Sequence, residues 1–397
     1  MGMATTTPDE PDQLIDVPAG LRGVAVTDTR LGDVRGAQGF FHYRQYSATD
    51  LARTRSLEDV WQLLLDGELP TTAAERDRFT AEIGPLRTVP DEVSDAVAGI
   101  ARHGGAGLGG LRTALSLLAQ ADDMPPLWDS PPQRRRRDLL RLAAATPTLI
   151  AALWRHSHGL EPIAPDPTLG HIADYLHMLG GTPTDTRAAR AVEQYAMLTV
   201  DHGFNASTFT ARVVASTGAD AGSAVVAALG ALSGPLHGGA PSRALQLLEA
   251  IGEPSRAAAW VRAAIERNER IMGFGHAVYR GDDPRSLLLR HIAQDLGGDL
   301  ADFAISVEAI ITATLAELRP DRHLYANVEY YAGVVMATCG IDRQLFTPTF
   351  AVGRTIGWTA NIAEQAADRR IIRPAARYTG PPPPQPVPEL NLDPEAR

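Results

Sequence analysis

The helical spacing of apolar residues constrains the fold of this chain more than any other feature of its sequence. In "ADFAISVEAIITATLAELRP" (301–320), apolar side chains return every three or four residues, at Phe303, Val307, Ile311, Leu315 and Leu318. This spacing places them on one face of a helix, and the closing proline cannot continue the helical hydrogen bonding. The segment predicts a long helix with one buried face.

A second segment, "SLEDVWQLLLDGELP" (56–70), carries the signals of both helix ends. Ser56 can cap the N-terminus and Asp59 completes a capping box, while Gly67 and Pro70 follow the last turn. The segment "AGSAVVAALGAL" is apolar nearly all round, which is typical of a buried helix. Alternating runs are few, and "GVAVTDTR" (23–30) is the best strand candidate. We therefore predict a mainly α fold with a minor N-terminal β element.

The composition bounds the class of protein. With 397 residues, 44% of them hydrophobic, the chain can form one large domain or two closely joined ones. Its 37 Lys and Arg against 47 Asp and Glu give a formal net charge of −10. This balance disfavours nucleic acid as a partner. An anionic small molecule would need a local group of arginines to bind.

The cysteine content and the apolar segments bear on compartment and metal binding. Cys339 is the only cysteine in the sequence, so no internal disulfide is expected and a reducing compartment is favoured. The start, "MGMATTTPDEPDQ", lacks signal-peptide features, and no window holds 18 apolar residues. His156 and His158 are two positions apart and do not share a helix face, so no metal site is predicted. We expect a cytoplasmic protein without a membrane span.

Three of the eleven histidines lie in segments rich in glycine or polar residues. His237 lies in "SGPLHGGAPSR", His276 in "IMGFGHAVYRGDDPR" and His202 in "DHGFNASTFTAR". Each alone is compatible with a hydrogen-bonded, partly buried side chain. Two histidines flanked by glycine, with a third in a polar segment, favour proton transfer near neutral pH instead.

A carboxylate and several arginines extend this set. Glu329 in "NVEYYAGVVM" is surrounded by apolar and aromatic residues, so it is either ion-paired or a base with a raised pKa. Arg354 in "GRTIGWTANIAEQ" and Arg373 in "RRIIRPAARYTG" lie close to apolar helical segments. Histidines, a carboxylate and arginines together indicate carbon-acid chemistry on a polyanionic substrate.

The blocks that carry these residues resemble the citrate synthase family. The resemblance runs from about residue 14 to about residue 379 and rests on eight blocks in family order: "HYRQYSATDLA", "LLLDGELP", "DHGFNASTFTARVVASTGAD", "GPLHGGAPSR", "GFGHAVYRGDDPR", "NVEYYAGVV", "GRTIGWTANIAE" and "RPAARYTG". It implies the almost wholly helical citrate synthase fold. The expected organisation is a mobile N-terminus (1–13), a large domain (14–239 and 346–379), a smaller inserted helical domain (240–345) and a proline-rich mobile tail (380–397).

The resemblance also implies a reaction and a role for each residue. The reaction is a Claisen condensation of acetyl-CoA with oxaloacetate, followed by thioester hydrolysis to citrate and coenzyme A. By resemblance, His237 would donate to the thioester oxygen, Glu329 would remove the methyl proton, and His276 would polarise the ketone. The oxaloacetate carboxylates would be bound by His202, Arg285, Arg354 and Arg373, the last from the other subunit of a homodimer.

Coenzyme A is expected as a substrate, with no permanently bound cofactor. By resemblance, it would be received by Arg280 and by the backbone at Gly273, Phe274 and Gly275. Glu329 departs from the commonest family motif, which has Asp there, and a misplacement of about 1 Å can cost about 100-fold in rate. Two alternatives stay open: a 2-methylcitrate synthase that uses propionyl-CoA, and a relative that binds coenzyme A or a dicarboxylate with weak turnover.

Overall fold

The computed structural model describes residues 14–103, 107–181, 185–235, 237, 240–276 and 278–388. The contacts divide the chain into two compact units, Met1–Asp28 with Ile372–Arg397, and Thr29–Ile371. The expected mobile N-terminus (1–13) and the last nine residues of the expected tail lie outside the described residues. In the described part of the first unit, Ala19–Leu21 form a short 3-10 helix, and Arg377 pairs with Asp16 at 2.7 Å.

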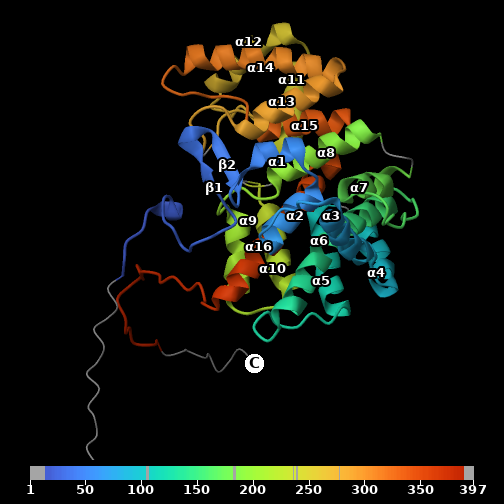
Figure 1. The fold of residues 1–397 in the computed structure, drawn as a ribbon. Helices are drawn as coiled ribbons and strands as arrows, with labels where there is room; N and C mark the ends of the chain where they lie inside the picture. The colour runs from blue at the N-terminus through green and yellow to red at the C-terminus, as the bar shows by residue number, and fades with distance from the viewer. Residues whose placement is uncertain are drawn as a thin grey trace, which may run out of the picture. The chain divides into compact units, whose positions relative to one another are not determined.

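The second unit is built almost entirely of helices, as predicted (Figure 1). Its first helices are α1 (Ala48–Thr54), α2 (Leu57–Asp66), α3 (Ala73–Ile83), α4 (Asp91–Arg102), α5 (Leu108–Ala121), α6 (Pro132–Ser157), α7 (His171–Gly180) and α8 (Thr186–Thr199). They are followed by α9 (Ala206–Ser216), α10 (Ala221–Leu232), α11 (Ala240–Ile251), α12 (Ala257–Glu266), α13 (Pro284–Leu296), α14 (Asp299–Leu318), α15 (Val328–Thr338) and α16 (Phe346–Asp368). Among the described residues, no helix combines the length and apolar character needed to cross a membrane.

The helix signals in the sequence correspond to real helix ends. Ser56 and Asp59 form the predicted capping box of α2, and Gly67 ends the helix in the left-handed conformation at φ 98°. On α14, the predicted face of Val307, Ile311 and Leu315 is buried. Both predictions are confirmed.

The β element is small and begins later than predicted. The strands β1 (Gly32–Arg35), β2 (Phe40–Tyr43) and β3 (Tyr46–Ser47) form an antiparallel sheet in sequence order. The pairing of β1 with β2 sets Gly32 opposite Tyr43. The predicted strand at 23–30 is wrong: at its end, Thr29 and the N–H of Arg30 bond to the Glu364 carboxylate rather than to a neighbouring strand.

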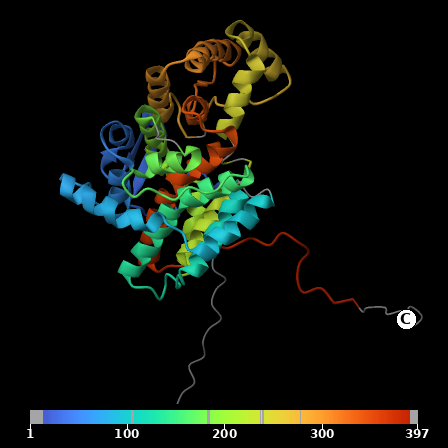
Figure 2. The same cartoon turned by 90° about the vertical axis from the view of Figure 1, so that its right-hand side faces the viewer.

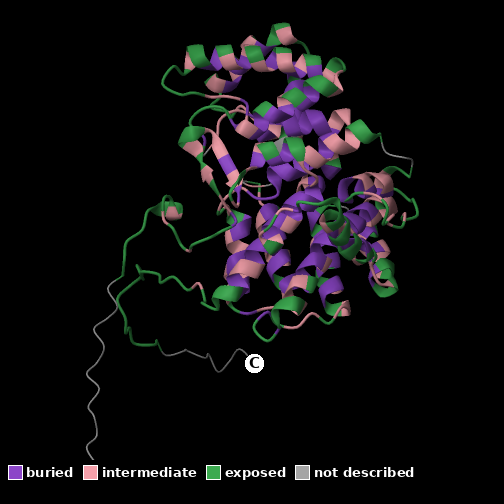
Figure 3. Ribbon diagram, viewed as in Figure 1, coloured by how far each residue is buried: buried purple, intermediate pink, exposed green. Residues whose placement is uncertain are grey.

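Buried residues (purple in Figure 3) run through the helices of this unit, and most of α16 is buried. In Figures 1 and 2, α16 (red) runs through the middle of the helices at one end, and the yellow and orange helices α11–α14 gather at the other end. A Cβ at Gly357 would lie 1.9 Å from the carbonyl oxygen of Val200, so α16 packs backbone to backbone against the end of α8. Thr29–Ile371 form a single unit by contacts, and the division into a large and a small inserted domain stays a prediction.

Candidate active site

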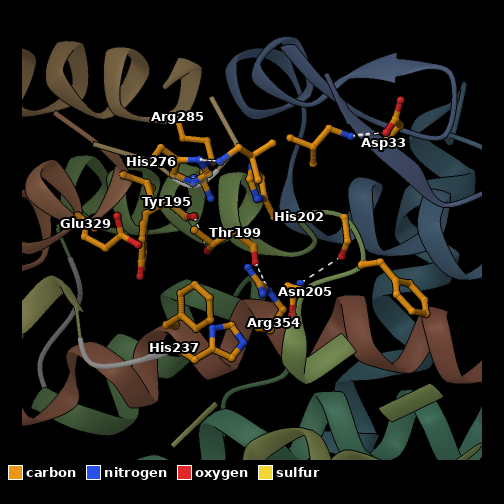
Figure 4. Close-up of a pocket in the computed structure, with 17 residues that line it drawn as sticks. Asp33, Tyr195, Thr199, His202, Asn205, His237, His276, Arg285, Glu329 and Arg354 are labelled. Carbon is orange, nitrogen blue, oxygen red and sulfur yellow. Dashed lines mark hydrogen bonds between the residues drawn. The ribbon is translucent and has the colours of Figure 1, made fainter. Parts of the chain in front are cut away.

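A cavity of about 530 Å³ brings together most of the predicted site residues (Figure 4). Its charged and polar lining comes from β1, α8, the turn before α9, the turn after α10, the loop before α13, and α13, α15 and α16. The predicted residues that line it are His202, His237, His276, Arg285, Glu329 and Arg354.

Arg285 is fixed in the first turn of α13 by Asp283. The carboxylate of Asp283 caps the helix through the Arg285 N–H and accepts from the guanidinium at 3.0 Å (Nε) and 2.8 Å (Nη2). It also accepts from the backbone N–H of Val328 at 3.1 Å. Both charged side chains are buried, with 4% and 2% exposure. Asp283 therefore ties α13 to the start of α15 and orients the guanidinium.

His276 has its protonation state set by its neighbours. Its Nδ1 accepts from the backbone N–H groups of Val278 at 3.0 Å and Tyr279 at 3.1 Å, so this nitrogen carries no proton. Burial, and then the charge of Arg285, lower the pKa of His276 to about 4. The neutral ring therefore holds its single proton on Nε2, which faces Arg285 Nη2 at 3.1 Å.

His202 is held beside His276 by a tyrosine. Its Nε2 lies 2.9 Å from the Tyr279 hydroxyl, and the Tyr279 ring lies 4.8 Å from the His276 ring. Burial, and then the Arg285 charge, hold the pKa of His202 well below its usual value. Both histidines are therefore neutral hydrogen-bonding groups at neutral pH.

Arg354 projects from the buried middle of α16. Its Nε donates to the carbonyl of Thr199 at 2.7 Å, and the guanidinium lies over the Phe350 ring at 4.5 Å. Burial lowers the pKa of Arg354 to about 10, so it keeps its charge at neutral pH. The close approach of Gly357 to Val200 is what brings this part of α16 to the cavity.

His237 follows α10 in a turn, as predicted, although Gly238 and Gly239 of that turn lie outside the described residues. Its Nε2 lies 2.9 Å from the Ser207 hydroxyl, which also accepts from Trp358 Nε1 at 3.2 Å. Burial, and then the charge of Arg354, lower the pKa of His237 to about 4. This imidazole is also neutral near pH 7.

Glu329 lies in the first turn of α15, at the wall of the cavity. Its Oε2 is buried and has no hydrogen-bond partner among the described residues. Burial raises the pKa of Glu329, and the charge of Arg285 opposes this rise. A carboxylate with a raised pKa and an unpaired oxygen has the properties of a general base.

A second cavity of about 470 Å³ adjoins the first, because His276 and Glu329 line both. The predicted residues Gly273, Phe274 and Gly275 line it, and the two glycines have φ of +84° and +80°. Arg270, Arg319 and Arg322 supply positive charge. Arg280 lines neither cavity; its backbone N–H donates to the Gly36 carbonyl.

Arg373 lies in the first unit, so its part in the site stays a prediction. Several residues of the site were not predicted from the sequence: Tyr195, Ser207, Tyr279, Asp283 and Phe350. Tyr279 and Asp283 lie within the block that carries His276, so their proximity to it was a usable signal. Tyr195 and Phe350 look like ordinary core residues in helical segments.

Comparison with known proteins gives a consistent result. The model of the family described as "Citrate synthase, C-terminal domain" matches residues 20–375. The citrate synthase of Deinococcus radiodurans is 36% identical over 370 residues, covering 92% of this chain and 96% of that protein. A 2-methylcitrate synthase of Mycobacterium tuberculosis is 37% identical over 379 residues, covering 93% and 92%.

Solved structures agree in fold. The citrate synthase of Thermoplasma acidophilum, in a ternary complex with carboxymethyl coenzyme A and oxaloacetate, superposes with a TM-score of 0.85 at 27% identity. The match covers 94% of this chain and 98% of that one. The citrate synthase of Thermotoga maritima gives a TM-score of 0.82 at 31% identity, covering 93% and 97%.

Proposed function

This chain belongs to the citrate synthase family and is an acyltransferase of the citrate synthase type. We propose that it condenses acetyl-CoA with oxaloacetate and hydrolyses the product to citrate and coenzyme A. The observation that carries this proposal is the lining of the larger cavity. Neutral imidazoles, a carboxylate with a raised pKa and two buried arginines meet there.

Oxaloacetate is a dicarboxylate, and the arginines of this cavity suit it. Guanidinium groups bind carboxylates through paired hydrogen bonds. Arg285 and Arg354 approach the cavity from α13 and α16, and His202 adds a neutral donor or acceptor between them. We assign these three residues to the dicarboxylate, and Arg373 from a second subunit stays a prediction.

The ketone oxygen would lie beside His276 and Arg285, within hydrogen-bond reach of both. The proton on His276 Nε2 can polarise the ketone and then be transferred to the alkoxide as the carbon–carbon bond forms. The nearby guanidinium stabilises the same developing negative charge.

His237 and Glu329 would enolise the thioester. Glu329 takes a proton from the acyl methyl group, while His237 donates a hydrogen bond to the thioester oxygen that gains charge. A neutral His237 suits this role, because the low pKa matches the imidazole to a weakly acidic enol. The enolate carbon then attacks the ketone carbon of oxaloacetate.

Coenzyme A is a substrate in this proposal and would occupy the adjoining cavity, with no resident cofactor required. The shared lining of His276 and Glu329 would place the thioester at the junction of the two cavities.

The variants Arg322→Ala and Arg280→Ala test which arginine binds the phosphates of coenzyme A. A higher KM for acetyl-CoA in Arg322→Ala alone would assign them to the second cavity, and one in Arg280→Ala would support the assignment made from the resemblance.

A second candidate function, 2-methylcitrate synthesis from propionyl-CoA, is favoured by the 37% identity to a 2-methylcitrate synthase. Val328, Ala332 and Phe350 form apolar lining near Glu329. One methylene in such a pocket discriminates by only about 1–3 kcal/mol, so use of both acyl groups is expected.

The test is thiol release from acetyl-CoA and from propionyl-CoA, each with oxaloacetate. The acyl group with the higher kcat/KM identifies the main reaction. Binding of coenzyme A without thiol release from either substrate would reject the proposal in favour of a binding relative.

We propose a homodimer in the cytoplasm, as expected from the sequence. The outward face of α10 carries the half-exposed, small or apolar residues Val226, Ala227, Gly230 and Ala231, which allow a close approach of another helix. Light scattering on the purified protein measures the subunit number, and a monomer at micromolar concentration would reject the dimer.

A further inference from the structure

Tyr195 on α8 is a buried tyrosine whose hydroxyl has no hydrogen-bond partner among the described residues. The side chain is 1% exposed and lines the larger cavity. The hydroxyls of five other tyrosines are hydrogen-bonded. Two of them donate to backbone carbonyls, Tyr43 to Met197 and Asp201 and Tyr330 to Ala304, and three bond to side chains, Tyr175 to Thr349, Tyr279 to His202 and Tyr331 to Glu308. Because an unpaired buried hydroxyl is unfavourable, its position at the cavity calls for an explanation.

The complementary group lies on the same wall. Glu329 Oε2 is also buried without a partner among the described residues, and α8 packs against α15. Figure 4 shows Tyr195 and Glu329 beside one another on one side of the cavity. One group donates a hydrogen bond and the other accepts one, and both are closed off from solvent.

We propose that Tyr195 is a positioning residue whose hydroxyl donates a hydrogen bond to Oε2 of Glu329 and so aims the other carboxylate oxygen at the acyl group. The terminal carboxylate of Glu329 can rotate toward this hydroxyl, because its sp³–sp² torsion is soft. The inference rests on the proposed function, because it assigns a task to Tyr195 through the base of that reaction.

The electrostatic surroundings of Glu329 make such a donor useful. Arg285 of α13 and Asp283, which caps that helix, act on the Glu329 charge in opposite directions, and the ring of His276, which lines the same cavities, is neutral. His237 and Arg354 line the same cavity from the turn after α10 and from α16. Burial dominates and raises the pKa of Glu329, whereas a hydrogen bond to the carboxylate lowers it. Burial and the charge of Glu329 raise the pKa of Tyr195 above its usual value, so the phenol stays a donor.

Tyr195→Phe tests the proposal, since it removes the hydroxyl and keeps the ring. The matched control is Tyr175→Phe, a buried tyrosine that bonds to Thr349 and does not line the cavity. We expect kcat at neutral pH to fall about tenfold in Tyr195→Phe, and the acid limb of the kcat profile to move up by about one pH unit. The KM for oxaloacetate should change less than about threefold. Tyr175→Phe should leave all three quantities near the wild-type values.

Two kinetic results would overturn the proposal. One is an unchanged kcat profile in Tyr195→Phe. The other is a raised KM for oxaloacetate with the acid limb unmoved, which would place the hydroxyl on the substrate. In the double variant with Glu329→Gln, the Tyr195→Phe change should add no further loss, because its effect passes through the carboxylate.

Infrared titration of the free wild-type protein gives a readout that does not depend on turnover or on the folding of Tyr195→Phe. The Glu329 band is assigned as the difference from Glu329→Gln. We expect an ionised carboxylate with a hydrogen-bonded frequency at neutral pH, and a protonated Glu329 there would overturn the proposal. If the wild type releases no thiol, the proposed function fails while this measurement still decides the pairing.

Discussion

Arg285 Nη2 lies 3.1 Å from Nε2 of His276, and both nitrogens carry protons. The His276 proton is on Nε2 because two backbone N–H groups occupy Nδ1. Two donors that face each other are stabilised by an oxygen that accepts from both. In the proposed reaction this acceptor would be the oxaloacetate ketone.

Arg285→Lys is expected to raise the KM for oxaloacetate by about 10- to 100-fold, because a lysine cannot keep the paired bonds to Asp283 and also reach the substrate. Steady-state kinetics measure the effect. Arg290→Lys on the same helix is the control, since Arg290 pairs with Glu308 away from the cavity. An equal rise in the KM for oxaloacetate in both variants would show that the effect comes from a general disturbance of α13 and not from the loss of the Arg285 guanidinium.

Ser207→Ala is expected to lower kcat about tenfold or more with little change in the KM for oxaloacetate. The substitution leaves His237 Nε2 and Trp358 Nε1 without their shared partner, which costs about 1–3 kcal/mol and loosens the imidazole. Ser130→Ala, at a buried serine bonded to the Pro126 carbonyl, is the control for the loss of a hydroxyl. An unchanged kcat in Ser207→Ala would show that Ser207 does not position His237 for the reaction.

Glu329→Gln is expected to lower kcat by about 10²- to 10⁴-fold and to raise the melting temperature at neutral pH. The folded-state pKa of Glu329 is raised, so its contribution to stability is present at low pH and is lost as the pH rises through that value. A neutral amide avoids this loss. Thermal melts of both proteins from pH 5 to pH 8 measure it, and a melting temperature below wild type at neutral pH would contradict the prediction.

The free energy of unfolding should increase as the pH rises from about 4 to about 6.5, because burial lowers the pKa of His237 and His276 from 6.5 to about 4. In this window the unfolded chain binds the more protons, so the native state loses stability as the pH falls. His237→Gln should flatten the dependence of melting temperature on pH. His103→Gln, at the exposed end of α4, should not, and the same slope in all three proteins would count against the assignment.

The fold was largely predictable because helix signals are local. The capping box at Ser56 and the apolar face of α14 depend on residues within a few positions of each other. The strand predicted at 23–30 failed because strand formation needs a partner, and the partner of β2 is the segment that starts at Gly32. The alternation in "GVAVTDTR" holds no information about that pairing.

The site was predictable only where residues sit in distinctive blocks. His237, His276 and Glu329 were selected from their sequence settings and were given roles by a family resemblance, and the structure brings them to one cavity. Tyr195 could not be found this way, because a tyrosine among apolar residues of a helix normally belongs to the core. Tyr195 differs from the other buried tyrosines because its hydroxyl has no hydrogen-bond partner among the described residues, and only the three-dimensional structure shows this.

Gly357 sets a limit on how this enzyme can vary. A methyl group at this position would meet the Val200 carbonyl oxygen at 1.9 Å, so any larger residue would wedge α16 away from the end of α8. Arg354 stands one turn earlier on the same helix and would retreat with it. The position of the Arg354 guanidinium in the cavity thus depends on the absence of a side chain at Gly357, a residue that does not line the cavity.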